Sequence, residues 1–175
     1  MTQLRFNFES IDVPSRSLAD ARLSAPRSDN CYGSVKRVSV VYEGSLQDRP
    51  CITNTEEAKR LFKSYWNQHP ANDQEQFVVA CLDTKHRVQC IVKVTVGTLD
   101  ASLVHPREVF KPAIIEGSAA ILLSHNHPSG NPEPSREDIQ VTDRLTEAGK
   151  ILGISVLDHI IHGDGTSEVQ SIREH

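Results

Sequence analysis

The sequence of 175 residues predicts an α/β protein in which a sheet carries helices on its faces. Three observations lead to this prediction. Short apolar runs rich in Val, Ile and Phe have the length and composition of strands. Longer segments between them place apolar residues every three or four positions, as amphipathic helices do. Capping residues, Gly and Pro separate the two kinds of segment.

Pattern and composition divide the chain into three parts. Residues 1–34 mix charges of both signs and show little periodicity, so we expect a poorly ordered N-terminal arm or a tail that binds a partner. Residues 35–71 form a lead-in that contains a strand over Val35–Tyr42 and a helix. Residues 72–175 are expected to form the core.

The helix of the lead-in has both an N-terminal signal and an apolar face. Thr53 is expected to cap its first turn, with Glu56 in the return position of a capping box. The apolar face consists of Ala58, Leu61, Phe62, Tyr65 and Trp66. Its aromatic side chains could stack nucleobases, but this spacing favours packing in the core. His69–Asp73 ends the helix.

The core is expected to begin with a hairpin of two strands, Gln76–Asp83 and Val88–Gly97. Cys81 and Cys90 should face each other across it. The four cysteines include no C-x-x-C pair, so we expect reduced core thiols rather than a zinc ribbon or a disulfide.

A helix should then start at Pro106 and run towards Glu116, although Pro112 is expected to kink or shorten it. Residues 119–127 are apolar until their end and read as a buried strand, followed by a loop with three prolines and a glycine over 128–134.

The last two predicted elements are a helix and a strand. The helix covers Ser135–Ile151, Gly153 ends it, and Ile154–Ile161 forms a further buried strand. We expect the buried stripe of the helix to consist of Val141, Leu145, Ala148 and Leu152.

The chemistry of the chain is concentrated where that strand and that helix meet. Residues i and i+2 of a strand point to the same face, so His125 and His127 can converge on one ion. Asp138 lies on the first turn of the next helix. Two imidazoles and one carboxylate leave a position open for water, as in a catalytic zinc site. Ser135 and Asp138 alone would be an ordinary helix cap, but the four residues together favour a metal centre in which Ser135 both caps and takes part in catalysis.

The spacing His-x-His-Pro, six residues, Ser, two residues, Asp resembles that of the JAMM/MPN metalloproteases. Further segments resemble the bacterial RadC family in the same order, from Thr53 to the end: Leu82–Lys85, Gly97–Leu99, Val104–Phe110, His125–Pro132 and Leu157–Ile161. The chain departs from the family in lacking the N-terminal helix-hairpin-helix region, in its short last motif and in Pro112.

The resemblance implies a JAMM/MPN-like (cytidine-deaminase-like) α-β-α sandwich with a mixed, curved sheet, one catalytic Zn²⁺ and a hydrolase of peptide or isopeptide bonds. His125, His127 and Asp138 would hold the metal, and Ser135 would donate to the oxyanion. The general base of such enzymes is a Glu at the start of an early strand, and Glu75 is in that place. Glu108 is the alternative, although its position in a first helical turn is also explained by the helix dipole.

Composition is consistent with such an enzyme. No segment approaches eighteen apolar residues and there is no apolar signal core, so we expect a soluble, cytoplasmic protein that does not enter a membrane. The net charge of −4 gives no general attraction to nucleic acid, so a protein or peptide substrate is favoured over DNA. The oligomeric state cannot be read from the sequence.

Two alternatives to the metallopeptidase remain open. One is a DNA repair or processing protein, as the historical family name implies, with metal-dependent nuclease activity. The other is a non-catalytic MPN interaction module. His159 is expected to be a hydrogen-bonded core residue or one that supports a ligand, and Asp158 could orient a ligand imidazole.

Overall fold

The computed structural model describes residues 4–5, 41–42, 49–71, 74–97 and 104–174. The chain forms two units, Met1–Ser45 and Leu46–His175. In the first unit β1 (Leu4–Arg5) pairs with β2 (Val41–Tyr42) in antiparallel fashion. Most of the predicted arm over 1–34 and of the predicted strand over Val35–Tyr42 lies outside the described residues, and the predicted domain boundaries stay a prediction.

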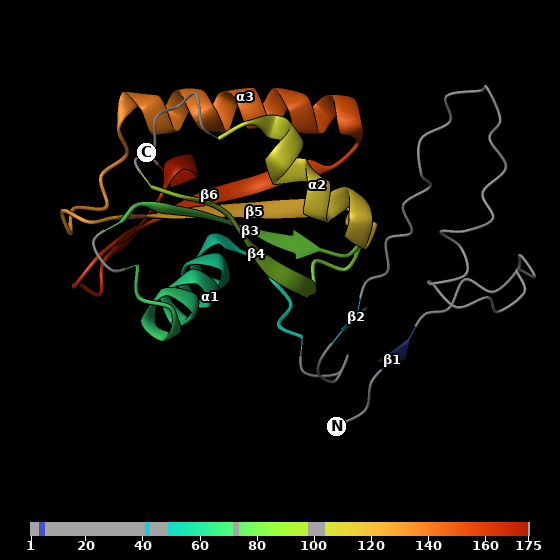
Figure 1. Cartoon of the computed structure of the whole chain (residues 1–175), viewed down its shortest axis with the longest axis horizontal. Helices are drawn as coiled ribbons and strands as arrows, with labels where there is room; N and C mark the ends of the chain where they lie inside the picture. Colours follow the sequence, from blue (N-terminus) through green and yellow to red (C-terminus); the bar gives the residue numbers. More distant parts are fainter. Residues whose placement is uncertain (1–3, 6–40, 43–48, 72–73, 98–103, 175) are drawn as a thin grey trace, which may run out of the picture. The chain divides into compact units, whose positions relative to one another are not determined.

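The second unit contains a five-stranded sheet in the order β4-β3-β5-β6-β7 (Figure 1). Its strands are β3 (Gln76–Leu82), β4 (Val88–Val96), β5 (Ala120–His127), β6 (Ser155–Gly163) and β7 (Val169–Ser171). Only β5 and β6 pair in parallel, while the other neighbours are antiparallel. The sheet is therefore mixed, as predicted.

Helices cover both faces of this sheet (Figure 1). On one face lies α1 (Thr55–Gln68), and on the other lie α2 (Pro106–Glu116) and α3 (Arg136–Leu152). Alternation along the strands separates two cores, since Val78 and Ala80 pack with α1 while Phe77 and Val79 pack with α2 and α3. Because both faces are covered, every residue of β3 is buried. The predicted α-β-α layout is confirmed.

The first turn of α1 differs from the prediction by one residue. The N-cap is Asn54, not Thr53, and its side chain accepts a hydrogen bond from the Glu57 backbone N–H at 2.9 Å. Glu57, not Glu56, reaches back and accepts from the backbone N–H of Thr53 at 2.6 Å. Asn is as good an N-cap as Thr or better, so the helix begins one residue later. The predicted apolar face is confirmed, with Phe62 and Trp66 buried.

Pro112 does not shorten α2, which runs to Glu116 and is capped by Gly117. The expectation of an early end was wrong because Val109, Phe110 and Ala113 on both sides of the proline are buried against the sheet. This packing outweighs the lost hydrogen bond.

The buried stripe of α3 also differs from the prediction at its end. Leu152 is 46% exposed, whereas Gly149 is buried. The chain turns back after Gly153, and this turn brings the backbone of Ile154 against Gly149. A larger side chain has no room there, so the helix places a glycine inside and Leu152 outside.

The hairpin of β3 and β4 pairs Cys81 with Cys90, and both thiols are free, as predicted. Burial and the hydrogen bond with Cys90 raise the pKa of the Cys81 thiol. Among the described residues, no helix has the length and apolar character needed to cross a membrane.

Candidate metal centre

Strand β5 brings the two predicted imidazoles to one face of the sheet. His125 and His127 point towards α3, with ring centroids 4.8 Å apart. Asn126 points to the other face, where it accepts a hydrogen bond from the Gln76 backbone N–H at 2.7 Å and donates to Asp164 at 2.6 Å. The alternation that the sequence predicted therefore holds at the end of β5.

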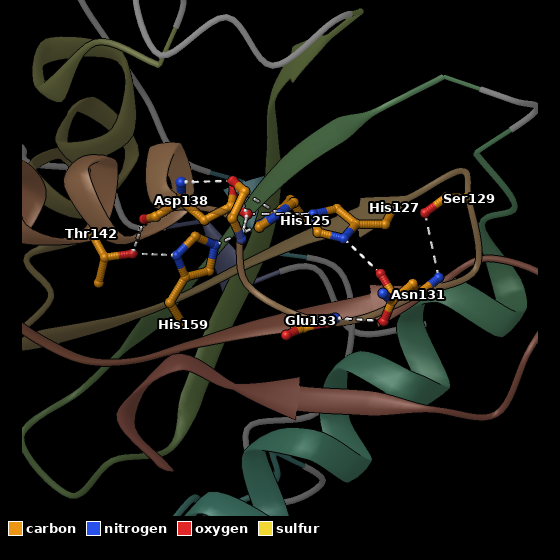
Figure 2. A network of polar contacts seen from close by, with 9 residues as sticks. His125, His127, Ser129, Asn131, Glu133, Asp138, Thr142 and His159 are labelled. Atoms are coloured by element: carbon orange, nitrogen blue, oxygen red, sulfur yellow. Dashed lines mark hydrogen bonds and ion pairs between the residues drawn. The ribbon is translucent and has the colours of Figure 1, made fainter. Parts of the chain in front are cut away.

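The first turn of α3 supplies the carboxylate. Ser135 is the N-cap and Asp138 is the third helical residue, and together they form a complete capping box. The Asp138 backbone N–H donates to Ser135 Oγ at 3.1 Å, and Ser135 Oγ donates to Asp138 Oδ2 at 2.6 Å. These contacts hold the carboxylate against the end of β5 (Figure 2).

Three side chains converge in this place. His125 Nε2 lies 2.9 Å from His127 Nε2 and 3.2 Å from Asp138 Oδ1. His127 Nε2 lies 3.5 Å from Asp138 Oδ2. Ligands about 2.1 Å from a tetrahedral zinc ion are about 3.4 Å from one another, so these three side chains fit such an ion. The cluster His125, His127 and Asp138 can hold a metal ion.

The tautomer of His127 also fits metal binding. Its Nδ1 lies 2.7 Å from the carbonyl oxygen of Asn131, which can only accept. Nδ1 therefore carries the proton and donates, and Nε2 presents a lone pair to the other two residues. The loop after β5 thus orients the imidazole at the open edge of the site.

Charge in the cluster is distributed as a metal site requires. Burial would raise the pKa of Asp138, but the close contacts with His125 and His127 and the hydrogen bond from Ser135 hold this pKa far below its usual range. Burial lowers the pKa of His125, which is fully buried. Burial also acts to lower the pKa of His127, but Asp138 and the Asn131 carbonyl raise it overall. The site thus offers an ionised carboxylate and a neutral His125 at neutral pH.

Glu75 lies beside the two imidazoles. Phe77 pairs with His125 across β3 and β5, and Glu75 directly precedes β3, two residues before Phe77. The negative charge of Glu75 raises the pKa of both His125 and His127, which is consistent with this position. Its backbone carbonyl accepts a hydrogen bond from Gly97 at 2.9 Å.

Glu108, the alternative candidate for the base, lies elsewhere. It is in the first turn of α2, its carboxylate is 3.3 Å from Arg107, and it lines a groove with Val92 and Lys111. The charge of Glu75 thus acts on both imidazoles, whereas Glu108 pairs with Arg107.

Two further residues contact the cluster from behind. His159 Nε2 lies 2.8 Å from His125 Nδ1, and His159 Nδ1 lies 2.6 Å from Thr142 Oγ1 (Figure 2). The prediction that Asp158 orients a ligand was wrong, because alternation in β6 turns it to the α1 face, where it accepts from Ser171 at 2.8 Å. Thr142 was missed, although it follows Asp138 by one helical turn and so shares its face.

Comparison with known proteins agrees with this geometry. The family model of the RadC-like JAB domain matches residues 52–175. A UPF0758 protein of Methanosarcina mazei is 44% identical over 157 residues, which cover 86% of this chain and 68% of that protein. A UPF0758 protein of Trichlorobacter lovleyi is 43% identical over 163 residues, which cover 90% of this chain and 71% of that protein. One of Alkaliphilus metalliredigens is 62% identical over 91 residues, covering 52% and 39%.

The chain spans 68% and 71% of the length of the two relatives with the longer matches. The domain match extends across the whole candidate site, from β3 to the end of β6. The resemblance drawn from the motifs is therefore confirmed, and this chain belongs to the RadC family, whose domain is of the JAB type.

Proposed function

We propose that this protein is a zinc-dependent hydrolase of peptide or isopeptide bonds. One observation carries the proposal: three candidate ligand side chains approach one another to 2.9 to 3.5 Å, in reach of one ion, while Ser135 contacts Asp138 and the charge of Glu75 acts on both imidazoles. Two nitrogens and one carboxylate oxygen suit Zn²⁺ with one position left open. When bound, zinc would polarise the scissile carbonyl and lower the pKa of a water molecule to about 7.

In this proposal the residues of the chain hold the site and move protons. Glu75 accepts a proton from the attacking water and passes it to the leaving amine, a role worth roughly 10²–10⁴ in rate. The Ser135 hydroxyl, which lies 2.6 Å from Asp138 Oδ2, turns to donate to the oxyanion. His127 is 15% exposed at its side chain, so substrate reaches the cluster on this side.

Metal content tests the site itself. The purified wild-type protein is expected to hold one zinc per chain, and His127→Ala and Asp138→Ala are expected to lose it. His69→Ala, at the exposed C-cap of α1, serves as the control and should keep the metal. A wild-type protein that binds no zinc, and folds unchanged when both imidazoles are replaced, would exclude a metallohydrolase.

The bond that is cleaved is tested with two substrates side by side. C-terminal fusions of small β-grasp modifier proteins should be hydrolysed, whereas labelled single-stranded DNA should stay intact. Glu75→Gln should keep zinc and lose at least about 100-fold in rate, with Glu108→Gln as the control. DNA cleavage that Glu75→Gln abolishes would instead favour the DNA-processing role that the family name implies. Zinc binding with neither reaction would favour an interaction module.

A further inference from the structure

Behind the candidate metal centre, a chain of hydrogen bonds connects two of its residues. It runs from His125 Nδ1 to His159 Nε2 at 2.8 Å, from His159 Nδ1 to Thr142 Oγ1 at 2.6 Å, and from Thr142 Oγ1 to the Asp138 carbonyl at 2.7 Å (Figure 2). This series of hydrogen bonds starts at one candidate ligand, His125, and ends on the backbone of another, Asp138. His159 is 1% exposed, so no bulk water competes for these contacts.

The donor and the acceptor of each hydrogen bond in this series follow from its last acceptor, the carbonyl oxygen of Asp138. The carbonyl oxygen of Asp138 can only accept, so the single proton of the Thr142 hydroxyl is directed to it. Thr142 Oγ1 must then accept the proton of His159 Nδ1. A neutral His159 has no second proton, so its Nε2 accepts from Nδ1–H of His125.

The consequence falls on the metal-facing atom of His125. With its proton held on Nδ1, a neutral His125 presents a bare Nε2, the atom that lies 3.2 Å from Asp138 Oδ1. A ligand imidazole usually gives this proton to a carboxylate or a backbone carbonyl. Here a second imidazole takes that role, and it is itself oriented by the helix that supplies Asp138.

The positions of these residues are provided by ordinary secondary structure. Thr142 follows Asp138 by four residues, and its bond to that carbonyl is the usual one for a helical Thr. His159 pairs in register with Leu123, two residues before His125 on β5, so both rings lie on the α3 face. The ring of Phe77 packs edge-on against His159 with centroids 5.3 Å apart, which limits its rotation.

We propose that His159 and Thr142 are positioning residues that lock His125 in its Nδ1–H tautomer and tie the β5 ligand to the α3 ligand. This inference rests on the proposed metal site. It adds to that proposal a pair of residues, outside the ligand set, that determines metal affinity. Neither residue touches the ion or the substrate.

The test compares variants whose side chains can still make the hydrogen bonds with variants whose side chains have a similar size but cannot make them. His159→Gln retains an acceptor for His125, whereas His159→Leu removes it. Thr142→Ser retains the hydroxyl, whereas Thr142→Val does not. Zinc affinity is measured by competition with a chelator, and the ligand geometry by the visible absorption spectrum of the Co²⁺-substituted protein. Val109→Ala, in the same core but away from the cluster, controls for lost stability.

We expect His159→Leu and Thr142→Val to lose about 10- to 100-fold in zinc affinity and to change the Co²⁺ spectrum. His159→Gln and Thr142→Ser should recover most of both, and Val109→Ala should be less stable with unchanged affinity. Wild-type affinity and spectrum in both His159→Leu and Thr142→Val would overturn the proposal, since the pair would then only fill the core.

A second readout separates this proposal from the proposed function. In metal-free protein, the ¹⁵N chemical shifts of His125 should report a single Nδ1–H tautomer, and His159→Leu should lose it. If the wild-type protein binds no zinc, the proposed function fails, while this tautomer measurement still supports or overturns the lock. A mixture of His125 tautomers in the wild-type protein would overturn it.

Discussion

At the residue scale, Ser135 has an observed role as a helix cap and a proposed role as an oxyanion donor. As the N-cap of α3 it accepts from the Asp138 backbone N–H, and its hydroxyl also donates to the carboxylate that faces the imidazoles. A cap contributes about 1 kcal/mol to stability, whereas a lost oxyanion donor costs about 10²–10³ in rate. The two roles therefore differ enough in size to be measured apart.

Ser135→Gly is the variant that separates them. Glycine at an N-cap costs only a few tenths of a kcal/mol, so the melting temperature should change little, yet no donor remains. We expect turnover of the fusion substrate to fall by about 100-fold or more while zinc is retained. Ser135→Thr keeps both functions and is the matched control. Full activity in Ser135→Gly would contradict the catalytic role.

At the element scale, a carboxylate organises the turn between β3 and β4. Asp83 accepts from the backbone N–H groups of Lys85 at 2.8 Å and Arg87 at 3.0 Å, and it pairs with the Arg87 guanidinium at 2.7 Å. Burial would raise the pKa of Asp83, but these contacts lower it overall. The turn holds the register that places Cys81 opposite Cys90.

The lowered pKa of Asp83 makes the stability of the hairpin depend on pH. The ionised form is favoured by folding, so its contribution is present above the unfolded pKa of about 3.9 and is lost as pH falls through the lower folded value. Asp83→Asn should cost about 1–2 kcal/mol at pH 7 and progressively less below about pH 4. Urea unfolding of the wild type and of Asp83→Asn across this pH range measures the difference in free energy of unfolding. A difference that stays constant with pH would contradict the assignment.

A second feature at this scale is the close approach of α3 to the start of β6. A β-carbon on Gly149 would collide with the backbone oxygen of Ile154 and lie 3.2 Å from the ring of Phe110. Glycine is therefore required for packing, although alanine is the better helix former by about 1 kcal/mol.

Gly149→Ala is expected to lower the free energy of unfolding in spite of its gain in helix propensity. Overpacking of this kind costs about 1–3 kcal/mol, which exceeds the gain. Lys150→Ala, at the adjacent exposed position, should stay within about 0.5 kcal/mol of wild type. Thermal denaturation of the wild type and the two variants tests this prediction. A stabilised Gly149→Ala would contradict it and would mean that the turn after α3 can shift.

At the scale of the whole molecule, the candidate metal centre and α1 lie on opposite faces of the sheet, and strand β5 contacts both. The indole of Trp66 donates to Ser124 Oγ at 3.0 Å from the face opposite the cluster, one residue before His125. Phe62 is fully buried between α1 and the sheet. Packing on one face of β5 is therefore linked through this strand to packing on the other face. Residues Leu46–His175 form one compact unit.

We expect this unit to unfold in one cooperative transition, with α1 included. Trp66, the single tryptophan, reports on α1 by fluorescence, while far-UV circular dichroism reports on all helices and strands. Both transitions should coincide, and Phe62→Ala should shift both by about 3–5 kcal/mol. A fluorescence transition at lower denaturant would instead show that 35–71 is a separate lead-in.

The sequence alone determined the parts of the site that are close in the chain. His125 and His127 share a face because strand geometry repeats every two residues, and Ser135 meets Asp138 because a helical turn joins residues three apart. The same local rules predicted β3 to β6, α3 and its caps, but not the short β7. They erred by one residue at Asn54, where two good caps are adjacent.

Only the tertiary structure decided which distant residues join these four. His159 rather than Asp158 follows from strand register and from the face on which each strand residue lies, while the preference for Glu75 over Glu108 came from the family resemblance and stays a prediction. His159 contacts His125 across 34 residues of sequence, and no local period extends that far. Pairing between strands and packing of helices on a sheet bring such residues together, so the support of the site became visible only in the folded chain.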